Sequence, residues 1–171
     1  MKPPYDISPE LIEQAKNIQL ALFDVDGVLT DGSLYFDANG EAMKKFNALD
    51  GHGLKMLQNQ GIAVGIISAR QSPALTNRLN ALGIQHQLTG INNKLVAMNH
   101  LLQELNITAE HTCFTGDDVI DIEVMQACKI KFSVENGHYS VKHIADWVTP
   151  MPGGSGAVRA ICDILLYAHH S

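Results

Sequence analysis

Two aspartates that lie two residues apart, Asp24 and Asp26, are the first candidates for chemistry in this sequence. They follow an apolar run and precede Gly27 and Thr30. A carboxylate can attack phosphorus directly, and a second carboxylate nearby can exchange a proton with the leaving oxygen. An Asp-Gly turn at the end of a strand is also common. The pair alone therefore favours neither chemistry nor a simple turn.

A second acidic group, formed by Asp117, Asp118 and Asp121, changes how the first is interpreted. By itself, Asp117-Asp118 would most simply cap the helix that follows. If both groups meet at one edge of a sheet, however, their carboxylates repel one another and need a cation between them. Magnesium suits that position because it takes hard oxygen ligands and is held by one or two carboxylates. The two groups together predict a Mg²⁺ site.

Three further side chains could bind an anion beside that metal. The hydroxyl of Ser68 and the backbone amides that follow it, at Ala69 and beyond, could hold phosphate oxygens. Arg70 is either an ordinary surface residue or a bidentate clamp for phosphate or carboxylate. Lys94 opens a predicted helix, where the macrodipole is already positive and a surface lysine is slightly unfavourable. A lysine held there against carboxylates and phosphate explains the pattern better.

The elements that must position these residues are apolar strands alternating with helices, which predicts an α/β fold. This pattern is typical of a three-layer, doubly wound parallel sheet, in which ligands gather at the carboxyl ends of the strands. Each polar cluster follows a predicted strand directly. The strands are expected at residues 18–25, 62–68, 112–116 and 130–134, with a weaker one at 85–88, and the helices at 54–60, 74–82, 93–105, 119–127 and 157–167.

One segment interrupts the alternation. Residues 33–36 and 41–46 flank Asn39-Gly40, and Asn-Gly between apolar runs is a strong signal for a β-hairpin. A two-stranded ribbon is only marginally stable by itself in water. We therefore expect the hairpin, a flap at about residues 33–46, to pack on something else, such as a neighbouring subunit.

Composition narrows the class of protein. The 171 residues suit a single domain over 1–171, and a net charge of −6 without a basic run argues against nucleic acid as a partner. No apolar run approaches the roughly 20 residues that span a bilayer, and the start lacks the pattern of a signal peptide. Three widely spaced cysteines are expected to be buried, reduced thiols. We expect a cytoplasmic protein without a membrane partner.

With these residues assembled, the chain resembles the haloacid dehalogenase superfamily of phosphatases. Four blocks carry the resemblance in order: D-V-D-G-V-L-T (24–30), I-I-S-A-R (66–70), N-K-L (93–95) and G-D-D-V-I-D (116–121). The longer blocks F-D-V-D-G-V-L-T-D-G, K-K-F-N-A-L-D-G-H-G and G-G-S-G-A-V-R-A-I-C-D are similar to the 3-deoxy-D-manno-octulosonate 8-phosphate phosphatases, a capless, tetrameric subgroup. The similarity runs from about residue 18 to about residue 166.

The resemblance implies hydrolysis of that sugar acid phosphate, in lipopolysaccharide sugar biosynthesis, through an aspartyl phosphate. It implies a core strand order of 5-4-1-2-3, no cap domain, and a homotetramer whose hairpins meet. It implies that Asp24 is the nucleophile and Asp26 the acid/base, and that magnesium binds to the Asp24 side chain, the Asp26 carbonyl and Asp117. It implies that phosphate and substrate are bound by Ser68, Ala69, Arg70, Lys94, Gly27 and Asn47. Asp118 and Asp121 would support the metal and Lys94.

Other functions remain open at this point. Leu49, Ser155 and Ala160 depart from the residues common in the subgroup, so a nine-carbon sugar acid 9-phosphate is an alternative substrate. A phospho-accepting signalling receiver uses similar residues, but its acidic pair precedes the phosphorylated Asp, whereas the second acidic cluster here comes late. An inactive assembly module of the same fold is a third possibility. Four intact residues argue against it: Asp24, Asp26, Lys94 and Asp117.

Overall fold

The structure, a computed structural model, describes residues 4–171 and has a parallel β-sheet at its centre. The sheet has six strands in the order β5-β4-β1-β6-β7-β8, and every pair of neighbours is parallel. Read from β7 to β5, the order is the 5-4-1-2-3 core that the resemblance implies, with β8 added at one edge. The strands are β1 (Leu20–Phe23), β4 (Ala63–Ser68), β5 (His86–Thr89), β6 (Thr112–Gly116), β7 (Ile130–Ser133) and β8 (Trp147–Val148).

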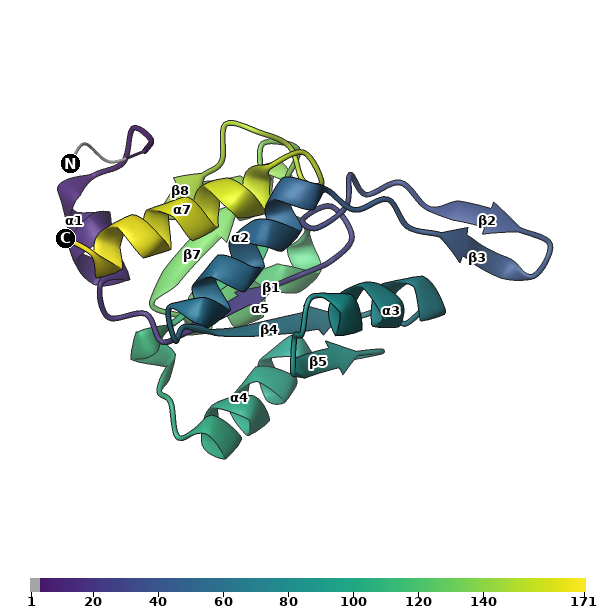
Figure 1. The fold of residues 1–171 in the computed structure, drawn as a ribbon, viewed down its shortest axis with the longest axis horizontal. Helices are drawn as coiled ribbons and strands as arrows, with labels where there is room; N and C mark the ends of the chain where they lie inside the picture. The colour runs from purple at the N-terminus through teal and green to yellow at the C-terminus, as the bar shows by residue number, and fades with distance from the viewer. Residues whose placement is uncertain (1–3) are drawn as a thin grey trace.

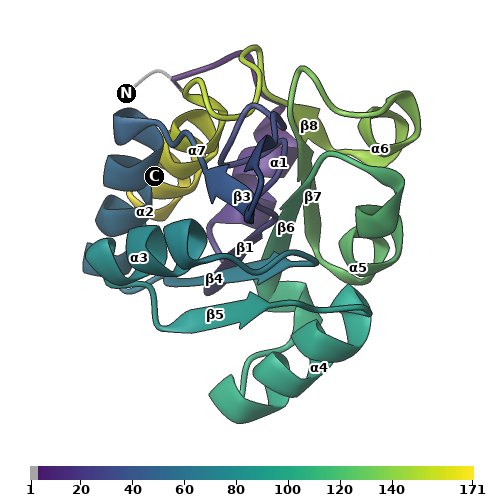
Figure 2. The ribbon, with the colours of Figure 1, turned by 90° about the vertical axis from the view of Figure 1, so that its right-hand side faces the viewer.

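Helices cover both faces of this sheet, which confirms the predicted three layers (Figures 1 and 2). One apolar core lies between the sheet and α1, α2, α3 and α7, and a second lies between the sheet and α4, α5 and α6. The central strand β1 is fully buried, as expected for a parallel strand covered on both sides. The helices are α1 (Pro9–Ala15), α2 (Ala48–Asn59), α3 (Pro73–Ala81), α4 (Lys94–Leu105), α5 (Ile122–Ala127), α6 (Tyr139–Ile144) and α7 (Ala157–His169).

The predicted strands and the ends of two helices are confirmed to within a few residues. Ser72 caps α3, because its hydroxyl accepts a hydrogen bond from the amide of Leu75 at 3.3 Å. Asn93 caps α4 in the same way, through the amide of Val96 at 2.9 Å. The segment predicted as one helix at 119–127 is instead a short 3-10 turn, η2 (Val119–Asp121), followed by α5.

Helix α2 begins six residues earlier than predicted. Asn47 caps it, and its first turns contain Gly51 and Gly53, which made this segment look like a turn. Both glycines lie under neighbouring side chains: a Cβ on Gly51 would overlap the guanidinium of Arg78, and one on Gly53 would lie closely against Cys162 of α7. Packing against neighbouring side chains thus outweighs the low helix propensity of glycine at these two positions.

The hairpin is present and projects from the body of the molecule (Figure 1). It consists of antiparallel β2 (Tyr35–Asp37) and β3 (Gly40–Met43), shorter than predicted, and turns at residues 38–39. Phe36 and Met43 are 61% and 55% exposed on it. The described residues between Ser68 and Lys94 hold only α3 and β5, so no cap domain is inserted there.

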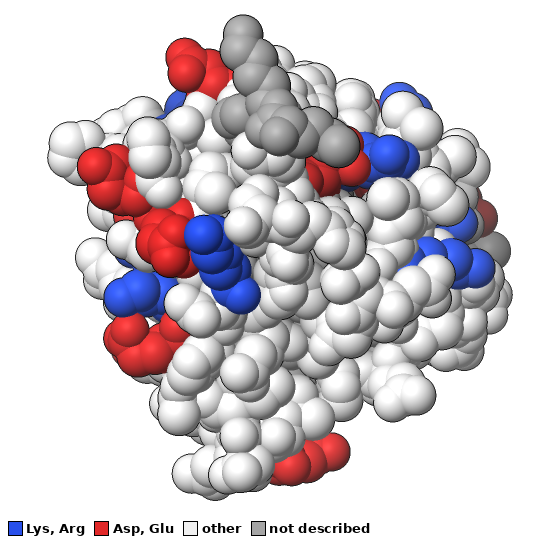
Figure 3. Space-filling view, turned by 60° about the vertical axis from the view of Figure 1, so that its left-hand side comes forward, with Lys and Arg blue, Asp and Glu red and all other residues white. Residues whose placement is uncertain are grey.

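Four elements were missed by the sequence reasoning: α1, α6, β8 and the short 3-10 helix η1 (Ala109–His111). The first carries a recognisable signal, because Ser8 caps it and Pro9 is its first residue. The three cysteines are free and buried, as predicted. Among residues 4–171, no helix combines the length and the apolar character needed to cross a membrane. On the face shown in Figure 3, Lys and Arg lie among Asp and Glu and do not form a continuous basic surface.

Candidate active site

The predicted polar residues meet at the carboxyl edge of the sheet. Strand β1 is flanked by β4 on one side and β6 on the other, so the chain changes direction across the sheet at this point. Such a switch point leaves a crevice at the strand ends. A cavity of about 300 Å³ opens there. It is lined by Asp24, Asp26, Gly32, Leu34, Ser68, Ala69, Arg70, Asp117, Asp118 and Ile120.

A buried lysine joins the two acidic clusters. The Nζ of Lys94 lies 2.9 Å from Oδ1 of Asp24 and 2.6 Å from Oδ1 of Asp121. The side chains of all three residues are at most 7% exposed. The first turn of α4 therefore delivers a cation between carboxylates from the end of β1 and from η2. This is the contact that the unusual position of Lys94 at a helix N-terminus predicted.

Asp121 organises the turn that follows β6. Its Oδ2 accepts hydrogen bonds from the backbone amides of Asp117 and Asp118, at 3.1 and 3.3 Å. The carboxylate of Asp118 accepts from the amide of Val119 at 2.7 Å, and the side chains and backbones of Asp118 and Asp121 form a reciprocal capping box. The capping function considered for Asp118 is therefore present, and it coexists with the gathering of carboxylates around Asp24.

Burial, together with neighbouring carboxylates, raises the pKa of two carboxyl groups, Asp24 and Asp117. Burial, followed by the charge of Asp121, raises the pKa of Asp24 to about 7, against the opposing effect of Lys94. Burial, followed by the charges of Asp24 and Asp121, raises the pKa of Asp117 to about 8. Burial alone would lower the pKa of Lys94, but its two carboxylate partners raise it. A cation bound here would favour the ionised carboxylates.

The residues present fit a hard divalent cation. Carboxylate oxygens of Asp24, Asp117 and Asp121 lie within 4.8 Å of one another. Oδ1 of Asp117 is buried without a hydrogen-bond donor among the described residues, which a neighbouring cation would remedy. Asp121 is already engaged by Lys94 and by two amides, so Asp24 and Asp117 are the carboxylates available to a metal. The side chain of Asp26 lies outside this group of three.

The side chain of Asp26 is turned toward two cations. Its Oδ1 lies 2.6 Å from Nζ of Lys44, and its Oδ2 lies 3.8 Å from Nε of Arg70. Lys44 follows β3 at the base of the hairpin and was not singled out by the sequence reasoning. The signal was available, because Lys44 opens the block K-K-F-N-A-L-D-G-H-G that supports the resemblance.

The loop after β4 supplies the polar group on the other side of Asp24. Ser68 is the last residue of β4 and is 1% exposed, and its hydroxyl accepts a hydrogen bond from the amide of Arg70 at 3.2 Å. Ala69 and Arg70 line the same cavity. The side chain of Arg70 is about half exposed, so it can reach a molecule in the cavity mouth.

Two predicted residues lie differently from the rest. Asn47 does not line the cavity; its Oδ1 accepts hydrogen bonds from the amides of Leu49 and Asp50, at 2.7 and 3.4 Å, at the start of α2. Gly27 borders the site through its backbone, at a φ of 90°. A Cβ added to Gly27 would overlap the carboxylate of Asp117. Glycine is thus required where the two acidic loops touch.

A loop from the distant C-terminal part of the chain holds the turn after Asp24 and Asp26 from behind. The side-chain amide of Asn136 donates to the carbonyl of Gly27 at 3.3 Å, and its oxygen accepts from the amide of Gly153 at 2.7 Å. The amide of Gly154 donates to the carbonyl of Val28 at 2.9 Å. A Cβ on Gly153 would overlap the Gly27 carbonyl, so the two backbones touch directly.

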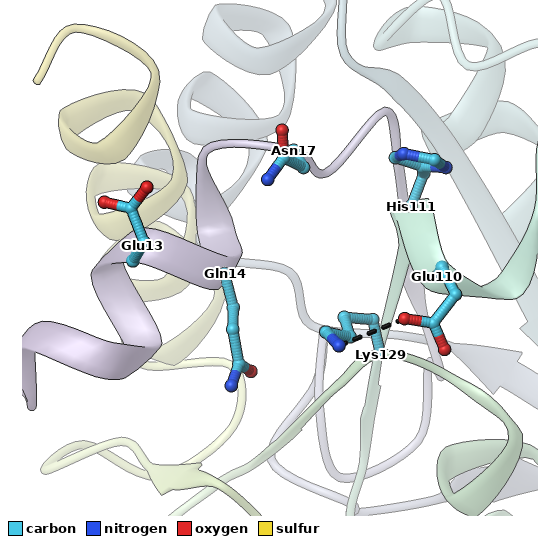
Figure 4. A pocket seen from close by; sticks show the side chains of 6 residues that line it. All are labelled: Glu13, Gln14, Asn17, Glu110, His111 and Lys129. Carbon is cyan, nitrogen blue, oxygen red and sulfur yellow. Dashed lines mark hydrogen bonds and ion pairs between the residues drawn. The ribbon is translucent and has the colours of Figure 1, made fainter.

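A second cavity, of about 320 Å³, lies at the opposite edge of the sheet (Figure 4). It is lined by Glu13, Gln14, Asn17, Glu110, His111 and Lys129. Its one lysine already pairs with Glu110 at 3.0 Å. Size therefore does not identify the site, since the two cavities are nearly equal. The buried carboxylates and the buried lysine do, because they occur together at the carboxyl edge of the sheet.

Comparison with known proteins agrees with this geometry. Residues 88–161 match the family model described as haloacid dehalogenase-like hydrolase. The chain is 42% identical to the 3-deoxy-D-manno-octulosonate 8-phosphate phosphatase of Salmonella typhimurium, over 95% of this chain and 86% of the relative. The corresponding phosphatase of Haemophilus influenzae is also 42% identical, over 91% of this chain and 87% of the relative.

Solved structures give the same result. The cobalt-bound phosphatase of Haemophilus influenzae superposes with a TM-score of 0.90 at 41% identity, covering 92% of both chains. The phosphatase of Moraxella catarrhalis, in complex with magnesium ion, phosphate ion and a KDO molecule, superposes with a TM-score of 0.91 at 36% identity, covering 94% of this chain and 92% of the other. The chain therefore belongs to the 3-deoxy-D-manno-octulosonate 8-phosphate phosphatase family of haloacid dehalogenase-like hydrolases.

Proposed function

We propose that this protein is a Mg²⁺-dependent phosphatase that hydrolyses 3-deoxy-D-manno-octulosonate 8-phosphate to the free sugar acid and inorganic phosphate. The observation that carries the proposal is the group of buried Asp24, buried Lys94 and partly buried Asp117 beside a cavity, in a chain 42% identical to such phosphatases. The reaction belongs to lipopolysaccharide sugar biosynthesis, and we place the protein in the cytoplasm, as one domain over residues 1–171 with the hairpin as a flap.

In the proposed mechanism, Asp24 is the nucleophile. Its carboxylate forms a bond to phosphorus as the bond between phosphorus and the sugar oxygen breaks. Asp26 gives its proton to that departing oxygen and then takes one from the water that hydrolyses the aspartyl phosphate. Lys94 orients Asp24 through Oδ1 and places positive charge beside the transferred phosphoryl group. Asp24 and Asp26 thus have different roles, and the fold places them beside different lysines, Lys94 and Lys44.

The remaining residues bind rather than react. The hydroxyl of Ser68 and the backbone amides of the loop after it donate hydrogen bonds to the phosphate oxygens, with Arg70 at the open side of the cavity. Asp24, the backbone carbonyl of Asp26 and Asp117 would hold Mg²⁺. When bound, Mg²⁺ neutralises charge on the phosphoryl oxygens during transfer. Asp118 and Asp121 support this arrangement through the capping box and through Lys94.

The same protein is proposed to act as a homotetramer. Leu34, Phe36 and Met43 are exposed on and next to the hairpin, which is too small a ribbon to be stable without a partner surface. Contact between hairpins of neighbouring subunits would cover these apolar side chains. It would also bring a second chain close to the cavity mouth, where Leu34 is one of the lining residues.

A panel of phosphate esters tests the function. Purified protein with Mg²⁺ is expected to release phosphate from 3-deoxy-D-manno-octulosonate 8-phosphate with a kcat/KM well above that for nine-carbon sugar acid 9-phosphates. Faster turnover of the nine-carbon substrates would replace the proposed substrate while retaining the chemistry. Asp24→Asn is the matched control, expected to abolish phosphate release and leave the circular dichroism spectrum unchanged. Turnover by Asp24→Asn would refute the nucleophile.

A further inference from the structure

Lys44 occupies a position that is unusual for a lysine at the base of a projecting hairpin. Its side chain is only 1% exposed. Its Nζ lies 2.6 Å from Oδ1 of Asp26 and 3.1 Å from Oε2 of Glu41. Lysine is almost never fully buried unless it is paired with an opposite charge. These two carboxylates are therefore what keeps the ammonium group in place.

The arrangement repeats the one around Lys94. Lys94 lies between the carboxylates of Asp24 and Asp121, and Lys44 lies between those of Asp26 and Glu41. In each case one carboxylate faces the cavity and the other holds the lysine from behind. The first group contains the proposed nucleophile, and the second contains the proposed acid/base. Each reacting carboxylate thus has a buried lysine of its own.

The pairing fixes one oxygen of Asp26 and leaves the other for chemistry. Lys44 engages Oδ1 at 2.6 Å, a distance typical of a strong charge-assisted hydrogen bond. Oδ2 lies 3.8 Å from Nε of the half-exposed Arg70, which is beyond hydrogen-bond distance. An acid must be held within hydrogen-bond reach of the oxygen that it protonates, and small misplacements are costly. Lys44 supplies such a restraint.

We propose that Lys44 is a positioning residue for the acid/base Asp26, so that the hairpin carries part of the proton-transfer machinery. The inference rests on the proposed function. In the step concerned, Asp24 forms its bond to phosphorus, the bond from phosphorus to the sugar oxygen breaks, and the proton of Asp26 moves to that oxygen. Lys44 does not touch the substrate in this step. It holds Oδ1, and thereby aims Oδ2 at the leaving oxygen.

The leaving group of the substrate provides the test. An alkoxide from a sugar needs a proton as it departs, whereas p-nitrophenolate is a weak base and leaves without one. For Lys44→Met, we expect kcat/KM to fall about 100-fold on the sugar acid phosphate, within the range that general acids contribute. On p-nitrophenyl phosphate the expected fall is less than about 5-fold. Because kcat/KM covers only steps up to the aspartyl phosphate, later hydrolysis does not blur the comparison.

A third substrate separates positioning from substrate binding. A simple alkyl phosphate without a carboxylate should lose as much activity in Lys44→Met as the sugar acid phosphate does. Loss confined to the sugar acid phosphate would mean that Lys44 binds the sugar carboxylate, and equal loss on all three substrates would mean a structural defect. Either result overturns the proposal, as does full activity on all three.

The neighbouring lysine is the matched control. Lys45 is 62% exposed and lies 3.4 Å from Asp31, away from Asp26. Lys45→Met should leave all three rates unchanged. Lys44→Arg, which keeps the charge, should have a kcat/KM on alkyl phosphates at least about tenfold higher than that of Lys44→Met. If Lys44→Met does not fold, Lys44→Gln is expected to give the same order of losses. Wild-type turnover of the sugar acid phosphate tests the proposed function separately from these ratios.

Discussion

Substitution of Gly27 by alanine should weaken metal binding more than it weakens the fold. Two effects add at this position. The backbone has a φ of 90°, which costs a residue with a Cβ about 1–2 kcal/mol. The new methyl group would also overlap the carboxylate of Asp117, which must move away from the site. Displacing a carboxylate ligand should lower Mg²⁺ affinity by at least about 10- to 100-fold, the range seen even for residues that only support ligands.

Gly61 provides a control that separates these effects. Its φ is 86°, nearly that of Gly27, but a Cβ added there would meet nothing within 4 Å. Gly61→Ala should therefore show the cost of the backbone alone, as a loss of about 1–2 kcal/mol in urea unfolding with normal metal binding. Isothermal titration with Mg²⁺ measures the second effect. If Gly27→Ala bound Mg²⁺ as tightly as Gly61→Ala, the contact between the two acidic loops would not shape the metal site.

Four other outcomes follow from the same structure. Since protons on Asp24 and Asp117, with pKa values raised to about 7 and about 8, compete with a cation, Mg²⁺ affinity should rise from about pH 6 to about pH 8 with proton release. The metal-free protein should lose stability over the same rise, because a raised carboxyl pKa favours the folded state only while the group is protonated. Calorimetry in two buffers and thermal unfolding check both, and a pH-independent affinity would contradict them. Lys94→Met removes the only cation paired with both Asp24 and Asp121 among the described residues and should cost about 3–5 kcal/mol in urea unfolding; a cost below about 1 kcal/mol would refute the assigned contact. Phe36→Glu should dissociate the proposed tetramer, seen by light scattering after gel filtration, and an unchanged mass would exclude the hairpin from the interface.

Much of the fold was predictable because it is a repeated local pattern. Buried parallel strands are short apolar runs, and Ser72-Pro73 and Asn93 are residue types typical of the helix starts that they form at α3 and α4. The errors arose where tertiary contacts decide the structure. The start of α2 was missed because it contains two glycines, which pack closely against Arg78 and Cys162, and these residues are far away in sequence. Strand β8 has only two residues and gives no periodic signal.

The candidate site was predictable for a different reason. In a parallel sheet the strand ends coincide, so clusters at Asp24, Ser68 and Asp117 had to be neighbours once the strands were placed. The position of Lys94 carried its own signal through helix electrostatics. Lys44 could not be found in this way, since its contact with Asp26 depends on how a hairpin with few restraints folds back over the sheet edge. No local pattern encodes that path.

The backbone contact between the turn at Gly27 and the loop at Gly153 affects when the protein can become active during synthesis. Asn136 joins these two regions across a separation of 109 residues from Gly27, so the turn gains its full support only after most of the chain has been made. Contacts of such long range also form late in folding, because a large loop must close first. A nascent chain that still lacks Gly153 and Gly154 lacks the backbone contacts that hold the turn at Gly27. We therefore expect hydrolysis only after the loop at Gly153 has been made.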